Sequence, residues 1–176
     1  IGEPWAGTKS QVLLFTGPLS GALTAEDAAA TLRFEEQHPA VIGAALSTAG
    51  DLNSDGLADV AVGVHAYECT DYSNEAHVLY GPAQGVLSVS QSDVVLTQEA
   101  AGDGAGDSLA FAGDMNGDGR DDLAIGAMAS SARGSRAGAV YIALEALSER
   151  QALSSVGAAF YGESEGAQAG LSLAPA

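Results

Sequence analysis

Two short acidic runs carry the chemistry that this sequence offers. Residues 51–59 and 114–122 share the pattern D-x-N-x-D-G-x-x-D, and the second run starts 63 residues after the first (114 minus 51). The pattern places oxygen-bearing side chains at positions 1, 3, 5 and 9, and position 7 offers a backbone carbonyl. Such a loop suits a hard cation that takes six to eight oxygen ligands, and calcium is the natural candidate. The predicted ligands of two Ca²⁺ sites are Asp51, Asn53, Asp55, Leu57, Asp59, Asp114, Asn116, Asp118, Arg120 and Asp122.

The glycine at position 6 explains how such a loop closes. Gly56 and Gly119 allow a sharp turn that a Cβ would hinder, whereas position 7 varies freely because it uses only its carbonyl. An EF-hand would carry a bidentate Glu at position 12, but Val62 and Ile125 stand there. An ordinary hairpin turn rich in Asp, Asn and Gly is the alternative for one copy, and the repetition in register favours the cation loop.

The elements that position these loops read as strands. Each loop runs into an apolar segment with β-branched residues, 60–64 and 123–127, so position 9 lies where the loop becomes a strand. The correspondence extends further, because Gly43, Gly106 and Gly170 recur at spacings of 63 and 64. A unit of this length accommodates roughly four short strands. The sequence therefore predicts an all-β repeat protein.

The residues of the two loops and their following strands resemble the FG-GAP repeat of integrin alpha chains and of many bacterial surface and secreted proteins. The matching pieces are residues 50–63 and 113–126, and the opening Ile1-Gly2-Glu3-Pro4 is similar to the family's "GAP" segment. The resemblance implies a β-propeller built from four-stranded antiparallel blades, with calcium in a hairpin loop of the blade. It also implies that partners bind loops away from the metal, so that the cation is structural.

The repeat phase divides the chain into about two complete units with flanking parts. We expect residues 1–30 to end one repeat, residues 31–93 and 94–157 to form the repeats with the first and second calcium loops, and residues 158–176 to start another. A propeller closes with about four to eight blades. We therefore expect either a longer parent protein or association between copies of this chain.

Charge and composition restrict the classes of partner and the location that this chain can have. With 23 acidic and 6 basic residues the formal net charge is -17, which repels nucleic acid and anionic membrane surfaces. No segment approaches the roughly 20 apolar residues of a membrane helix, so we expect no membrane insertion. Cys69 is the single cysteine and excludes an internal disulfide. Weak calcium loops work where the ion is near millimolar, which favours an extracellular or cell-surface location.

The sequence offers no catalytic constellation, and we expect a protein that is not an enzyme. His38, His65 and His77 lack the spacing of a triad or a zinc site, and Asp121, beside a predicted ligand, is expected to be solvated. The favoured function is a calcium-binding extracellular module for adhesion or for binding an unknown protein or glycan. The alternatives are a structural unit that self-associates into a ring, fibre or stalk, and a non-catalytic propeller part of a secreted hydrolase.

Overall fold

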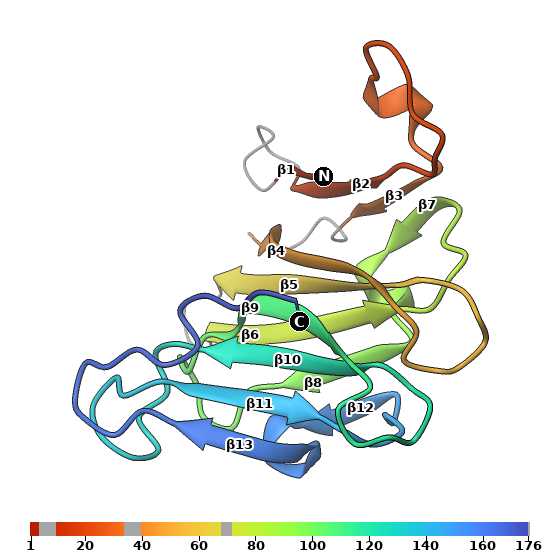
Figure 1. Ribbon diagram of the computed structural model, residues 1–176. Coiled ribbons are helices and arrows are strands. Elements are labelled where there is room, and N and C mark those ends of the chain that lie inside the picture. The colour runs from red at the N-terminus through yellow and green to blue at the C-terminus, as the bar shows by residue number, and fades with distance from the viewer. Residues whose placement is uncertain (4–9, 34–39, 68–71, 176) are drawn as a thin grey trace.

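The computed structural model describes residues 1–3, 10–33, 40–67 and 72–175 (Figure 1). His38, Pro4 and Cys69 lie outside the described residues. The described chain forms three β-sheets and three single 3-10 turns, and it has no helix long and apolar enough to cross a membrane. The expected all-β fold is confirmed.

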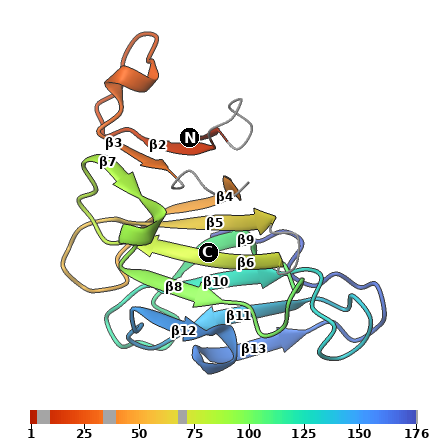
Figure 2. The same cartoon turned by 180° about the vertical axis from the view of Figure 1, so that it is seen from behind.

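Most strands of each sheet come from one stretch of the chain, and the three stretches follow one another (Figures 1 and 2). The first contains β1 (Gly2–Glu3), β2 (Gln11–Leu14), β3 (Ala30–Arg33) and β7 (Gly85–Ser88), in that spatial order. The second has the order β12 (Arg150–Ala152), β8 (Val94–Thr97), β6 (Tyr72–Leu79), β5 (Asp59–Tyr67) and β4 (Ala40–Gly50). The third has the order β13 (Gly157–Tyr161), β11 (Ala139–Ala143), β10 (Asp122–Ala127) and β9 (Ala105–Gly113). The 3-10 turns are η1 (Ala25–Asp27), η2 (Val89–Gln91) and η3 (Leu153–Ser155).

Two strands depart from a purely antiparallel arrangement. β7 pairs in parallel with β3, and β12 pairs in parallel with β8. Each of them lies in the connection between the third and fourth strands of its own repeat, yet it joins the fourth strand of the preceding sheet. The sequence analysis did not predict these added strands, which link neighbouring sheets through backbone hydrogen bonds.

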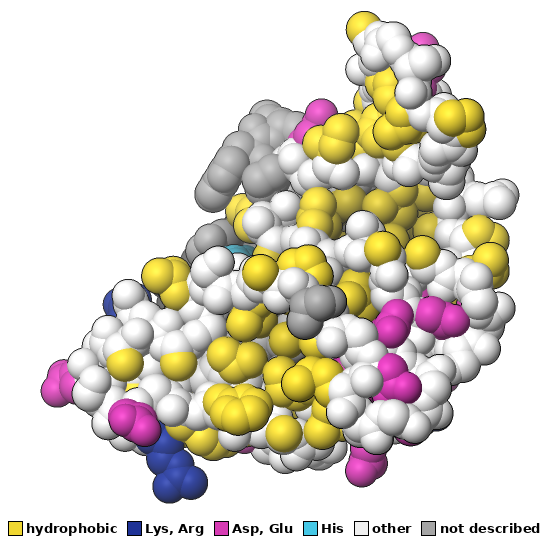
Figure 3. Space-filling model, viewed as in Figure 1, with side chains coloured by type: hydrophobic (Ala, Val, Ile, Leu, Met, Phe, Trp, Pro, Cys, Tyr) yellow, Lys and Arg dark blue, Asp and Glu magenta, His cyan; other side chains and the backbone are white. Residues whose placement is uncertain are grey.

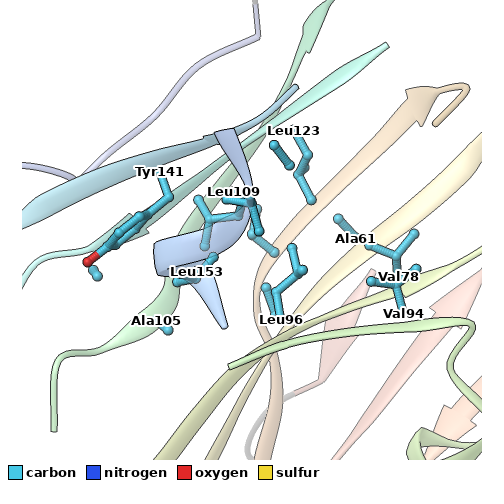
Figure 4. Close-up of a cluster of buried hydrophobic side chains, with 14 of the residues drawn as sticks. Ala61, Val78, Val94, Leu96, Ala105, Leu109, Leu123, Tyr141 and Leu153 are labelled. Atoms are coloured by element: carbon cyan, nitrogen blue, oxygen red, sulfur yellow. The ribbon is translucent and has the colours of Figure 1, made fainter. Parts of the chain in front are cut away.

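The sheets stack face to face around two apolar clusters. The larger cluster fills the space between the second and third sheets, and Figure 4 shows Leu96, Leu123 and Leu153 within it. The smaller cluster joins the first and second sheets through Leu32, Ile42 and neighbouring residues. All six residues of β10 are buried, as expected for a strand that is covered on both faces.

Glycine pairs set the distance between stacked sheets. A Cβ added to Gly63 would collide with the carbonyl oxygen of Gly106, and a Cβ on Gly126 would collide with that of Gly170. Gly2 stands in the same relation to Gly43. The glycines that recur at spacings of 63 and 64 are thus half of a close backbone contact that is repeated three times, twice between sheets and once, at Gly170, with the segment that follows β13. Their partners on β1, β5 and β10 must also lack a side chain.

Candidate functional site

Both acidic loops join the first and second strands of a sheet and lie at one side of the molecule. The loop of residues 51–58 connects β4 to β5, and the loop of residues 114–121 connects β9 to β10. Figure 3 shows Asp and Glu side chains gathered at the side where Figure 1 places these loops. The expected passage from loop into strand is confirmed, because β5 begins at Asp59 and β10 at Asp122.

The backbone of the loops has the expected turn at position 6. Gly56 has φ +82 and Gly119 has φ +88, a conformation that L side chains rarely adopt. No heavy atom lies within 4 Å of a Cβ built on either residue, so conformation and not space requires glycine. Position 4 is also left-handed, with Ser54 at φ 58 and Gly117 at φ 78, which the motif alone did not indicate.

The first loop folds its oxygens inward. Asp51 Oδ1 and Asn53 Oδ1 both accept a hydrogen bond from the backbone N–H of Asp55, at 3.1 and 3.0 Å, so these two oxygens lie on one side of the same atom. Asp51 Oδ2 accepts from the backbone N–H of Gly56 at 2.8 Å. The side-chain amide of Asn53 donates to Asp55 Oδ2 at 2.9 Å. The side chains at positions 1, 3 and 5 are therefore brought together.

The second loop repeats this arrangement and adds a charged side chain to it. Asp114 Oδ1 and Asn116 Oδ1 accept from the backbone N–H of Asp118 at 3.0 and 2.9 Å. The guanidinium of Arg120 also donates to Asp118 Oδ2 at 2.7 Å, whereas Leu57 at the same position of the first loop has no charge. The backbone N–H of Arg120 lowers the pKa of Asp118, and the guanidinium lowers it further. The second loop thus carries its own positive charge.

The aspartates at position 9 are the buried members of the set. Asp59 is fully buried; its Oδ2 accepts from the backbone N–H of Leu52 at 2.7 Å and its Oδ1 from that of Gly81 at 2.9 Å. Asp122 Oδ2 likewise accepts from the backbone N–H of Met115 at 2.7 Å. Burial raises the pKa of both carboxyl groups, and the other carboxylates of each loop raise it further. The aspartate at position 9 therefore holds the loop backbone through hydrogen bonds and also faces the other carboxylates of the loop.

The donor chemistry of the loops fits a hard cation. Each predicted shell is made only of oxygens, and its carboxylates repel one another, a repulsion that a divalent cation would relieve. Each predicted shell contains three aspartates, but no three His, Cys, Asp or Glu side chains among the described residues are gathered closely enough to hold a metal ion. The ligand assignment stays a prediction.

A direct contact between the two loops was missed by the sequence analysis. Asp121 Oδ2 accepts from the backbone N–H of Asp51 at 2.9 Å, and the backbone N–H of Asp121 donates to the carbonyl of Asp51 at 3.0 Å. The hydroxyl of Ser54 donates to the carbonyl of Gly119 at 2.8 Å. The expectation that Asp121 is solvated was wrong, because stacking of the sheets places it against the other loop.

The histidines that the structure describes lie beside acids. His65 Nε2 on β5 lies 3.2 Å from Asp107 Oδ1 on β9. His77 is buried between Glu75, 3.1 Å from its Nε2, and Ser92, 3.1 Å from its Nδ1. Sequence spacing gave no signal for the Ser92 contact, since the connection that contains β7 and η2 separates the two residues along the chain.

The Glu75, His77 and Ser92 group has the residue types of a catalytic triad but not its hydrogen bonding. The Ser92 hydroxyl donates to the carbonyl of Val89 at 2.8 Å, so its hydrogen is not shared with the imidazole. The guanidinium of Arg150 also holds Glu75. The group therefore connects β6, η2 and β12.

Comparison with known protein families agrees with this geometry. The FG-GAP repeat matches twice, at residues 43–79 and 105–142. Each match covers the first three strands of a sheet, β4 to β6 and β9 to β11, together with the acidic loop between the first two. No curated protein matches the chain. The two matches and the stacked antiparallel sheets identify the chain as an FG-GAP repeat protein whose sheets are β-propeller blades.

Proposed function

We propose that the chain is a calcium-binding extracellular module for adhesion or for binding a protein or glycan, and that Ca²⁺ stabilises its two hairpin loops. The supporting observation is the convergence of the oxygens at positions 1 and 3 on one backbone N–H in both loops. FG-GAP repeats are typical of extracellular proteins, which supports the proposed location.

Calcium would supply positive charge and nothing reactive. Asp51, Asn53 and Asp55 would hold one ion with the carbonyl of Leu57 and the carboxylate of Asp59. The equivalent residues of the second loop, Asp114, Asn116, Asp118, Arg120 and Asp122, would hold the other. Because the loops contact each other through Asp121, an ion in one loop would also steady the other. The blades would then present their remaining loops to a partner as a rigid surface.

We also propose that the chain is not an enzyme. The hydroxyl of Ser92, which lies 3.1 Å from His77 Nδ1, donates to the carbonyl of Val89, and the carboxylates of the two loops are engaged by backbone N–H groups. The net charge of -17 speaks against nucleic acid and anionic membranes as partners. A protein or glycan ligand fits these constraints best.

Calorimetric titration with calcium tests the proposal directly. We expect two binding equivalents for the wild-type chain and one equivalent each for Asp55→Ala and Asp118→Ala. Glu163→Ala, which removes an exposed carboxylate far from both motifs in the sequence, serves as the control and should retain two. Two equivalents in either loop variant would refute the ligand assignment.

Thermal unfolding provides an independent test of the same sites. Chelation with EDTA should lower the stability, by about 1.4 kcal/mol per site if each site is filled at about ten times its dissociation constant. The two single-site variants should each lose part of that response. A melting temperature that excess EDTA leaves unchanged would remove calcium from the proposal.

A further inference from the structure

The connection between β6 and β8 encloses a pocket that the calcium proposal does not use. Its volume is about 460 Å³, within the range of about 300–1,000 Å³ that is usual for small-ligand pockets. All of its lining residues come from residues 79–93, a segment that includes β7 and η2. Figure 2 shows β7 and the neighbouring end of β6 at one side of the molecule. None of the lining residues is a predicted calcium ligand.

The buried and half-buried lining residues of the pocket are continuous with the core. Leu79 is buried in the smaller apolar cluster, and the half-buried Leu87 packs against that cluster. Tyr80 is also half-buried and packs against the larger cluster. A ligand in the pocket would therefore cover apolar side chains and gain free energy from their burial.

The exposed lining residues of the pocket are mostly polar. Gln84, Gln91 and Asp93 contribute two primary amides and one carboxylate. Asp93 Oδ2 accepts a hydrogen bond from the backbone N–H of Tyr80 at 2.7 Å, and Asp93 Oδ1 has no hydrogen-bond partner among the described residues. Gln91 Oε1 accepts from the backbone N–H of Ser88 at 2.8 Å, so its amide N–H groups remain for a ligand. The pocket thus offers donors and acceptors side by side.

Hydrogen bonds at both ends of the segment hold the pocket in shape. The backbone N–H of Gly81 donates to Asp59 Oδ1 at 2.9 Å, and the backbone N–H of Asp93 donates to the carbonyl of Val78 at 2.9 Å. Gly81 also lies so close to the first acidic loop that a Cβ there would collide with the carbonyl oxygen of Ala58. The walls are therefore fixed before a ligand arrives, which lowers the conformational cost of binding.

The third repeat builds the same connection without a carboxylate. Gly157 stands 64 residues after Asp93 (157 minus 93), and Leu144 stands 64 residues after Tyr80 (144 minus 80). The backbone N–H of Leu144 donates to the carbonyl of Val156 at 3.1 Å, whereas the backbone N–H of Tyr80 donates to the side chain of Asp93. Since a backbone bond is enough to hold this turn, the fold does not require the carboxylate of the pocket. Binding of a ligand would explain its presence in the second repeat.

The mixture of polar and apolar groups selects the class of ligand. An anion would be repelled by Asp93 and by the net charge of -17. A cation needs acceptors only, whereas the two amides of the pocket also present N–H donors. The hydroxyl groups of a sugar both donate and accept, and its C–H groups can contact the apolar wall. We propose that this pocket binds a saccharide of one or two units.

Each group of the pocket has a distinct role toward the sugar. The Asp93 carboxylate accepts from a sugar hydroxyl through Oδ1, and the amides of Gln84 and Gln91 donate to hydroxyl oxygens. Leu79 and Leu87 contact the C–H groups of the sugar ring. Saccharide binding rests on the proposed function, because it names the glycan as the ligand, but it uses no predicted calcium ligand. A chain that binds sugar and no calcium, or calcium and no sugar, would therefore separate the two proposals.

Calorimetric titration of the full chain tests the pocket with the methyl glycosides of glucose, galactose, mannose, fucose and N-acetylglucosamine. We expect at least one glycoside to bind with a Kd of about 1 mM or lower. Asp93→Asn, which keeps an oxygen for the backbone N–H of Tyr80, and Gln84→Ala should each weaken this binding about tenfold. Ser148→Ala is the matched control, because the exposed Ser148 stands 64 residues after Gln84 (148 minus 84). It should bind as the wild type does.

Two further probes identify the source of the ligand. An immobilised array of oligosaccharides that end in the same sugars should retain the wild type if the sugar belongs to a larger glycan, whereas binding of the glycosides alone would indicate a free saccharide. Nα-acetyl-lysine methylamide represents a lysine side chain of a partner protein, and we expect it not to bind. Its binding in place of every sugar would overturn the proposal, as would a panel and array without any binding. Sugar binding that Asp93→Asn and Gln84→Ala both leave unchanged would overturn it as well.

Discussion

The glycine pairs between blades lead to a sharp prediction for Gly63→Ala. Gly63 lies on β5, and its backbone lacks the positive φ that disfavours L side chains, so alanine is conformationally acceptable. The added methyl group would, however, meet the carbonyl oxygen of Gly106 well inside 3.0 Å, a distance that real Cβ contacts essentially never go below. A second neighbour, the Cβ of Ala45, would lie at 3.3 Å. Because both obstacles are rigid, the second and third blades must separate.

The size of the effect follows from two opposing contributions. A separation of roughly 1 Å forfeits a quarter to a half of the dispersion energy of the atoms that lose contact, and overpacking of this kind typically costs about 1–3 kcal/mol. Replacing glycine also stiffens the unfolded chain, which stabilises the protein by about 0.4–1 kcal/mol. The net expectation is a loss of about 1–2 kcal/mol. For a chain of this size that is a decrease in melting temperature of roughly 2–8 °C.

Thermal and urea unfolding of three alanine variants measure this quantity. Gly17→Ala is the control for substitution alone, because a Cβ at Gly17 meets no heavy atom within 4 Å and the backbone is not left-handed. Gly85→Ala is the control for conformation, since Gly85 has open space but φ +72. If Gly63→Ala is as stable as Gly17→Ala, the close approach of the blades does not limit the side chain and the reasoning is refuted.

Three further predictions concern the two loops and the ion pairs of Glu75. Arg120→Leu frees Asp118 from its guanidinium partner and should increase the calcium affinity of the second loop by severalfold to about tenfold in calorimetry. An unchanged affinity would show that the arginine does not compete with calcium for Asp118. Asp121→Ala should lower the unfolding free energy by about 1 kcal/mol and weaken calcium binding at the first loop as well, whereas an effect on stability alone would argue against coupling between loops. Glu75→Gln should cost at most about 1 kcal/mol at pH 7 in chemical denaturation. Burial raises the pKa of Glu75, but His77 and Arg150 outweigh this effect and hold the pKa below its ordinary value of 4.5. The stabilisation is therefore present above pH 4.5 and disappears as the pH falls through the folded-state pKa. A difference in stability that does not depend on pH would contradict this account.

Much of the architecture could be predicted from the sequence because its signals are local. The positions of Asp51 and Asp114 within a nine-residue pattern, the glycine at position 6 and the apolar run after position 9 each depend on neighbours a few residues away. Such patterns report the turn, the strand and the repeat period directly. The loops, the strands that leave them and the blade repeat are accordingly confirmed by the structure.

Only the tertiary structure decided how the repeats contact one another. Asp121 reaches the first loop, and the segments of β7 and β12 join the preceding blade rather than their own. None of these contacts follows from spacing along one strand or one loop, because they form only when separate sheets stack. The sequence determined which residues each blade contains. The close packing of blades at the paired glycines determined which residues of neighbouring blades touch, since side-chain periodicity fixes which face of a strand a residue lies on but not which blade packs against that face.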